Sequence, residues 1–181
     1  MRDKARYIPE NAIDPTRFDR VREPGSSGGG GPLRVVFVGR LVPYKAPDVL
    51  LEAAAPLCAR GEVELTIVGD GPMMDGLKQR VRTLGLGNVR IPGHVPHVRL
   101  KELLAGMDVF AFPSVREFGG AVVVEAMATG LVPVVVDYGG PGEIVTRETG
   151  VRVPVGGREE LTRRFRDELA SLSRDRARVE A

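Results

Sequence analysis

The stretch PSVREFGGAVVVEAMATGLVPVVVDYGGPGEIV, from Pro113 to Val145, decides the fold of this chain. The apolar run Val109–Phe112 that precedes it is typical of a buried strand. Residues 121–129 favour a helix that Gly130 ends, and Val132–Val136 form a second apolar run. The stretch therefore predicts a strand, a glycine-rich turn, a helix and a second strand. In a parallel sheet such a turn lies at the carboxyl ends of the strands, where open α/β folds bind ligands.

Two carboxylates mark this unit. Glu117 stands just ahead of the predicted helix, and Glu125 lies inside it among Val, Ala and Met residues. Between them, Gly119 and Gly120 let backbone N–H groups approach a ligand closely, and the helix start adds a partial positive charge suited to phosphate. About six residues at 1.5 Å rise place Glu125 roughly 9 Å along the helix axis from these glycines. A nucleoside diphosphate-sugar matches this layout, because carboxylates at its two ends can accept hydrogen bonds from sugar and ribose hydroxyls.

Strands alternating with single helices continue on both sides of this unit, which predicts an α/β fold with a Rossmann-like, doubly wound parallel sheet over residues 33–181. The turn GDGP at 69–72 is predicted to start a helix with Pro72 at its first position. The predicted strands are Leu33–Val38, Val63–Val68, Asn88–Ile91, Val109–Phe112, Val132–Val136 and Gly150–Val155, and the predicted helices are Asp48–Arg60, Met73–Leu84, His97–Met107, Ala121–Thr129 and Arg158–Arg178.

Composition narrows the class of protein. With 181 residues and 43% hydrophobic content, the chain can bury the core of one domain. The net charge is only +2, and acids interleave the basic residues near the C-terminus, so no nucleic-acid partner is expected. The single cysteine, Cys58, allows no disulfide within the chain and is expected in the core. No signal peptide opens the sequence and no apolar run reaches the ~18 residues of a membrane span, so a cytoplasmic location is expected.

Several motifs are absent. The first predicted strand is followed by GRLVPYK rather than G-x-G-x-x-G, which disfavours a nicotinamide or flavin dinucleotide. The chain contains no P-loop motif and no Asp-x-Asp pair, and its two histidines and one cysteine predict no metal site. The charge of a diphosphate would then be met by cations and backbone N–H groups. Arg40 and Lys45, in the loop after the first strand, can supply the cations.

The E-x7-E spacing from Glu117 to Glu125, followed by AMATG, VPVVV and GGPGEIV, resembles the retaining GT-B glycosyltransferases of family 4. The resemblance implies that the chain is the C-terminal half of a GT-B enzyme. It also implies that Glu117 contacts the donor sugar, that Gly119, Gly120 and Ala121 hold the diphosphate at the helix start, and that Glu125 holds the ribose. The chain departs from the usual E-G-F-G order, because Phe118 precedes Gly119; this change concerns the shape of the sugar pocket.

Two further segments carry the resemblance. The family's G-R-x-x-x-x-K arrangement corresponds to Gly39, Arg40 and Lys45, although Ala46 stands where a glycine is usual. The turn after Asn88–Gly93 is where the family contacts the nucleotide base through backbone atoms, which implies a role for the backbone of Val95. Residues 1–32, with Ile8–Phe18 approximating the family's IP-N-G segment, are expected to be an interdomain linker, partly flexible, so that the acceptor-binding N-terminal domain is missing from this chain.

The expected function is binding of a UDP-, GDP- or ADP-sugar for metal-independent, retaining transfer of the sugar to an acceptor hydroxyl. No other cofactor is expected, and contact with a membrane is expected only if the acceptor is a lipid. Two alternatives remain open at this point: a nucleotide-sugar-binding module without catalysis, and a GT-B-fold nucleotide-sugar epimerase. The epimerase would need additional catalytic acids and bases, which the sequence does not present.

Overall fold

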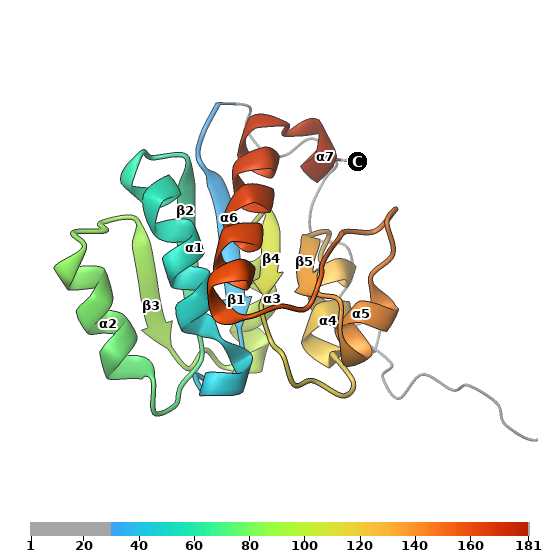
Figure 1. Cartoon of the computed structure of the whole chain (residues 1–181), viewed down its shortest axis with the longest axis horizontal. Helices are drawn as coiled ribbons and strands as arrows, with labels where there is room; N and C mark the ends of the chain where they lie inside the picture. The colour runs from blue at the N-terminus through green and yellow to red at the C-terminus, as the bar shows by residue number, and fades with distance from the viewer. Residues whose placement is uncertain (1–29, 181) are drawn as a thin grey trace, which may run out of the picture.

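The computed structural model describes residues 30–180 and is built on one six-stranded parallel sheet (Figure 1). Its strands are β1 (Leu33–Val38), β2 (Val63–Val68), β3 (Val89–Gly93), β4 (Val109–Phe112), β5 (Val132–Val136) and β6 (Val151–Val153). They stand in the order β3-β2-β1-β4-β5-β6, so the order reverses between β1 and β4. This is the doubly wound, Rossmann-like topology that the sequence predicts, and it places a ligand crevice at the carboxyl ends of β1 and β4.

Helices cover both faces of the sheet, with α1 and α6 in front of it and α3 behind it in the view of Figure 1. The helical segments are the 3₁₀ turn η2 (Pro43–Lys45) and the α-helices α1 (Pro47–Ala59), α2 (Met74–Thr83), α3 (His97–Ala105), α4 (Ala121–Ala128), α5 (Gly139–Ile144), α6 (Arg158–Arg174) and α7 (Ala177–Glu180). The helices α1 and α6 pack against each other. Arg158, at the start of α6, pairs with Asp48 and, at 3.0 Å, with Glu52 of α1.

The core consists of the strands and the inner faces of these helices. Phe37, Phe110 and Phe112 are fully buried, and the rings of Phe110 and Phe112 stack with centroids 5.5 Å apart. Cys58 is buried among them as expected, and burial raises the pKa of its thiol to about 12. Apolar burial on both faces of the sheet explains why the strands read as continuous hydrophobic runs.

Most predicted elements are confirmed, and the differences have local causes. The strand β6 is shorter than predicted because Pro154 cannot donate to a strand ladder. The helix α3 stops at Ala105 because Gly106 follows. The prediction for Pro72 is wrong, since α2 begins at Met74 and the N–H of Met73 donates to the carbonyl of Leu41. The stretch Gly139–Ile144 forms a helix that was not predicted.

The predicted C-terminal helix Arg158–Arg178 is also wrong as one element, because it breaks at Asp175 between α6 and α7. The break turns Arg176 inward to Asp108, whose side chain is fully buried at the amino end of β4. Asp108 accepts hydrogen bonds from Arg34 Nη2 at 2.8 Å and from Arg176 Nη2 at 3.1 Å. Burial alone would raise the pKa of Asp108, but Arg34 and then Arg176 outweigh it and hold the pKa below its usual range.

The predicted division into a linker over residues 1–32 and a domain over residues 33–181 concerns a linker that falls almost wholly outside the described residues. Among residues 30–180, no helix has both the length and the apolar character needed to span a bilayer.

Candidate functional site

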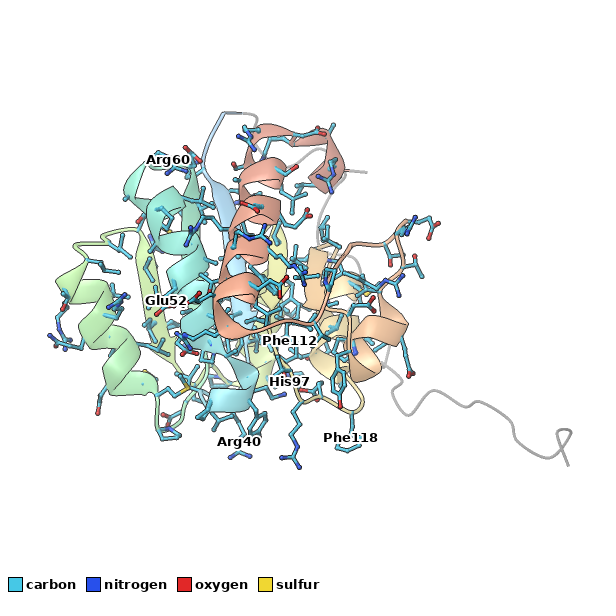
Figure 2. The ribbon with its side chains drawn as sticks, in the orientation of Figure 1. Arg40, Glu52, Arg60, His97, Phe112 and Phe118 are labelled. Atoms are coloured by element: carbon cyan, nitrogen blue, oxygen red, sulfur yellow. The ribbon has the colours of Figure 1, made fainter. Side chains whose placement is uncertain are left out.

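The candidate site lies along the carboxyl edge of the sheet, where the loops after β1, β3 and β4 meet. Figure 2 shows Arg40, His97 and Phe118 along this lower edge, whereas Arg60 lies at the opposite end of the molecule. The three labelled residues come from three different crossovers of the fold, so the topology brings together segments that are far apart in the sequence.

The loop after β1 carries Gly39, Arg40 and Lys45, and it is held by the neighbouring strand ends. The N–H of Gly39 donates to Val68 at 3.0 Å and that of Leu41 to Asp70 at 2.8 Å. A Cβ atom added to Gly39 would meet only the rings of Phe37 and Phe112, at ordinary contact distances of 3.4 Å or more. The packing of the protein therefore does not by itself require a glycine at this position.

Ala46, which follows Lys45, has the left-handed backbone angle φ of 52°. It is the N-cap of α1, and its N–H donates to the carbonyl of Pro43. Side chains with a Cβ atom occupy this conformation at a cost of roughly 1–2 kcal/mol, whereas glycine occupies it freely. The conformation explains why glycine is usual at this position in the family that the sequence resembles. This chain forms the same turn with alanine in place of glycine.

Lys45 and Glu117 form an ion pair that joins the loop after β1 to the loop after β4. The ammonium of Lys45 donates a hydrogen bond to Glu117 Oε2, and the side chains are only 15% and 19% exposed. The Lys45 Nζ atom also lies 4.9 Å from the centroid of the Phe112 ring. Burial, and after it the positive charge of Arg40, lowers the pKa of Lys45, while the contact with Glu117 favours the charged ammonium. The structure thus places Lys45, which the sequence predicts to contact the diphosphate, beside Glu117, which is predicted to contact the donor sugar.

Backbone contacts hold the same two loops together. The N–H of Val115 donates to the carbonyl of Tyr44 at 3.0 Å, and the hydroxyl of Ser114, which is 2% exposed, donates to the same oxygen at 3.3 Å. Sequence reasoning did not identify Tyr44 or Ser114, because a hydrogen bond to a backbone carbonyl leaves no signature in residue type.

The helix α4 begins at Ala121 with Gly120 as its N-cap, and Gly120 has φ of 71°. The carbonyl of Gly120 accepts from Val123 at 2.8 Å, so the helix is formed from its first turn. The N–H groups of Ala121 and Val122, as the first of a helix, have no acceptor within it. They are geometrically able to bind an anion at the end of α4, where the helix dipole favours negative charge. Gly119 lies directly before this point and is half-buried.

Glu125 lies one turn further along α4, beside the loop that follows β3. Its Oε1 atom is 3.9 Å from Nε2 of His97, the first residue of α3. Burial raises the pKa of Glu125, and the charge of His97 opposes that rise. His97 was not among the predicted site residues; its place at the start of a predicted helix on the carboxyl edge was the signal that could have found it. Val95 is half-buried in the same loop and packs against the core.

Within residues 30–180, no three His, Cys, Asp or Glu side chains gather closely enough to hold a metal ion. The charged groups at this edge of the sheet include both cations and carboxylates. Cations and helix N–H groups lie at the start of α4, and carboxylates lie on either side of it.

The chain belongs to the group 1 glycosyl transferases, because the model of that family matches residues 23–180. A GDP-mannose-dependent alpha-mannosyltransferase of Mycobacterium tuberculosis (strain CDC 1551 / Oshkosh) is 35% identical over 175 residues, which cover 96% of this chain and 43% of that protein. The chain therefore spans less than half the length of this relative.

Solved structures confirm the GT-B glycosyltransferase fold. The C-terminal domain of a glycosyl transferase group 1 family protein from Francisella tularensis has a TM-score of 0.77 at 20% identity and covers 93% of this chain and 91% of that domain. The Anabaena protein HepE in complex with UDP-glucose has a TM-score of 0.70 at 25% identity, over 93% of this chain and 46% of HepE.

Proposed function

We propose that this chain binds a nucleoside diphosphate-sugar and is the donor-binding part of a retaining glycosyltransferase. The observation that carries the proposal is the contact of Lys45 with Glu117 at the start of α4, with Glu125 further along the same helix. Membership of the group 1 glycosyl transferases supports it, as does the complex of HepE with UDP-glucose.

In this proposal the diphosphate lies at the amino end of α4. The N–H groups of Ala121 and Val122 bind its oxygens, and Arg40 and Lys45 approach it from the loop after β1. Glu125 accepts hydrogen bonds from the ribose hydroxyls, and the backbone of Val95 contacts the base. Glu117 accepts hydrogen bonds from the donor sugar, at the end of the ligand away from the base.

The reaction that follows forms a bond from an acceptor oxygen to the anomeric carbon and breaks the bond from that carbon to the diphosphate. The proton of the acceptor hydroxyl passes to the leaving diphosphate. Negative charge develops on the leaving diphosphate, and the cations and helix N–H groups stabilise it there, which is commonly the largest single contribution to such a step. Glu117 holds the sugar in the orientation for attack. The acceptor site would come from the remainder of a longer protein, in keeping with the length of the mycobacterial relative.

Calorimetric titration of the 181-residue chain with UDP, GDP and ADP, and with UDP-glucose, GDP-mannose and ADP-glucose, tests the donor site. We expect one diphosphate and its sugar conjugate to bind, with EDTA present, since cations and N–H groups replace a metal in this site. The matched variants are Arg40→Ala, which should weaken the diphosphate far more than the bare nucleoside, and Arg60→Ala, at the opposite end of the molecule, which should change neither. Absence of binding to all six ligands would refute the donor site, and transfer assays on the full-length protein, with and without acceptor, would separate an enzyme from a binding module.

A further inference from the structure

The start of α5 lies directly against the loop that carries Glu117. Gly139 and Gly140 are its first two residues, and Gly140 is buried. The N–H of Gly140 points at the carbonyl oxygen of Glu117 at 3.4 Å. This backbone contact links the GGPG segment after β5 to the loop after β4, although neither segment contributes a side chain to it.

No side chain can be accommodated at either glycine. A Cβ atom added to Gly139 would fall well inside 3.0 Å of the carbonyl oxygen of Glu117, a separation that real Cβ atoms do not show. One added to Gly140 would fall equally close to the carbonyl oxygen of Phe118 and 2.6 Å from that of Gly119. Gly139 also has φ of 58°, but Gly140 is not left-handed, so the neighbouring loop alone requires a glycine at position 140.

The contact continues to the start of α4. A Cβ atom on Gly120 would lie 3.2 Å from both the Cδ and N atoms of Pro141. The segment Gly139–Pro141 therefore underlies the segment Glu117–Gly120 along its length. On its other side, the loop after β4 is held by Lys45 and by the carbonyl of Tyr44.

We propose that Gly139 and Gly140 are positioning residues that set where Glu117 meets the donor sugar. The proposal rests on the donor site proposed above. The two glycines contact the carbonyls of Glu117, Phe118 and Gly119, whereas the N–H groups offered to the diphosphate belong to α4 itself. A methyl group at position 140 displaces the loop relative to the helix, so it disturbs the sugar end of the ligand more than the diphosphate.

The test compares Gly140→Ala with Gly142→Ala in the 181-residue chain. Gly142 lies in the same helix, but its Cβ atom would meet Asp137 at 3.0 Å rather than the loop after β4, so it controls for a general disturbance of α5. Dissociation constants are measured for UDP, GDP and ADP and for UDP-glucose, GDP-mannose and ADP-glucose, together with the melting temperature. We expect Gly140→Ala to weaken the sugar conjugate about tenfold more than the free diphosphate, the size of effect expected for a weakened hydrogen bond to a charged group. Gly142→Ala should leave that ratio unchanged.

Equal losses for diphosphate and sugar conjugate in Gly140→Ala, or the same selective loss in Gly142→Ala, would overturn the inference while leaving the donor site intact. Absence of binding by the unmodified chain would instead refute the donor site. If Gly140→Ala does not fold, Pro141→Ala replaces it, because removing the ring loosens the contact with Gly120 without adding atoms. A selective loss for the sugar conjugate is then expected in smaller measure, and no selective loss would overturn the inference.

Discussion

The ammonium of Lys45 donates a hydrogen bond to the carboxylate of Glu117, a residue 72 positions further along the chain. Both side chains are largely buried, and Glu117 lies four residues before the first residue of α4. In the proposed donor site, a bound diphosphate would compete with Glu117 for Lys45. The ion pair is therefore expected in the site without ligand, and the interaction energy between Lys45 and Glu117 should fall when a diphosphate binds.

A double-mutant cycle measures that change. We expect Lys45→Met and Glu117→Gln to show a coupling free energy of about 1–3 kcal/mol in chemical unfolding without ligand, as contacting polar residues do. In the presence of saturating UDP or GDP the coupling should fall, because Lys45 then contacts phosphate oxygens. A coupling unaltered by a diphosphate that binds would mean that Lys45 does not contact it.

Substitutions of Glu117 and Glu125 should differ in which ligands they weaken. Glu125→Gln should weaken free diphosphates and nucleotide-sugars alike, by about 1–3 kcal/mol, the range for a hydrogen bond to a charged group. Glu117→Gln should not weaken the free diphosphate, because it only removes the carboxylate that competes for Lys45, but it should lower turnover in the full-length protein. Calorimetry on both variants decides the direction of the ligand, since a larger loss of diphosphate affinity from Glu117→Gln would show that the ligand runs the opposite way along α4.

The affinity for a diphosphate should depend on pH through Glu125. Burial raises the pKa of this carboxyl, so it becomes protonated at a higher pH than an ordinary glutamate. Once protonated, it accepts hydrogen bonds from ribose hydroxyls less well. The charge of His97 opposes the rise, so His97→Ala should move the midpoint to still higher pH. Titrations with UDP or GDP at several pH values measure it, and the difference between variants cancels titration of the phosphate. His94→Ala, an exposed change in the same loop, should leave the midpoint in place.

Asp108→Asn should reduce stability without affecting the donor site at the other edge of the sheet. Removing the charge of Asp108 weakens its hydrogen bonds to the partly exposed Arg34 and Arg176, which should cost about 1–3 kcal/mol. Because the pKa of Asp108 is lowered on folding, its contribution is present above the pKa of the unfolded chain and is lost as the pH falls through the folded pKa. The variant should therefore lose less stability on acidification than the unmodified chain.

Urea unfolding at several pH values measures both effects. Asp167→Asn on the exposed face of α6, where the carboxylate pairs with Arg163 at 3.3 Å, is the control and should change little. Equal stability of Asp108→Asn and Asp167→Asn would contradict the assignment of Asp108 as a stabilising group.

Ala46→Gly should stabilise the chain, although glycine usually destabilises. The left-handed backbone of Ala46 costs roughly 1–2 kcal/mol, and the greater freedom of glycine in the unfolded chain returns part of this. The net gain should be about 0.5–1 kcal/mol in urea unfolding. Ala53→Gly within α1 should have the opposite sign, because its backbone is helical and glycine lowers helix stability. Destabilisation by both changes would show that the turn at residue 46 is not strained.

The elements whose bounds the sequence predicted best are strands made of continuous runs of buried apolar residues. The bounds of β4 and β5 match the predicted Val109–Phe112 and Val132–Val136, because runs of almost wholly buried apolar residues define both strands. The short helix α5 was not predicted because GGPG has poor helix propensity and its conformation depends on contacts with the loop after β4.

The site was predicted in parts rather than as an arrangement. The spacing of Glu117 and Glu125 and the cations of the loop after β1 follow from local patterns, and the sequence carries no signal that Lys45 and Glu117 are paired. The same holds for His97 beside Glu125 and for Arg176 beside Asp108. These contacts join residues of distant elements, and the order of the strands decides which elements become neighbours.

The cluster at Asp108 also has a consequence for synthesis of the chain. Arg176 lies 68 residues after Asp108, so a nascent chain can complete every strand of the sheet before the second arginine leaves the ribosome. Until then the buried carboxylate lacks its hydrogen bond from Arg176. The charge cluster at the amino end of β4 is thus completed by one of the last described residues, after all six strands have been synthesised.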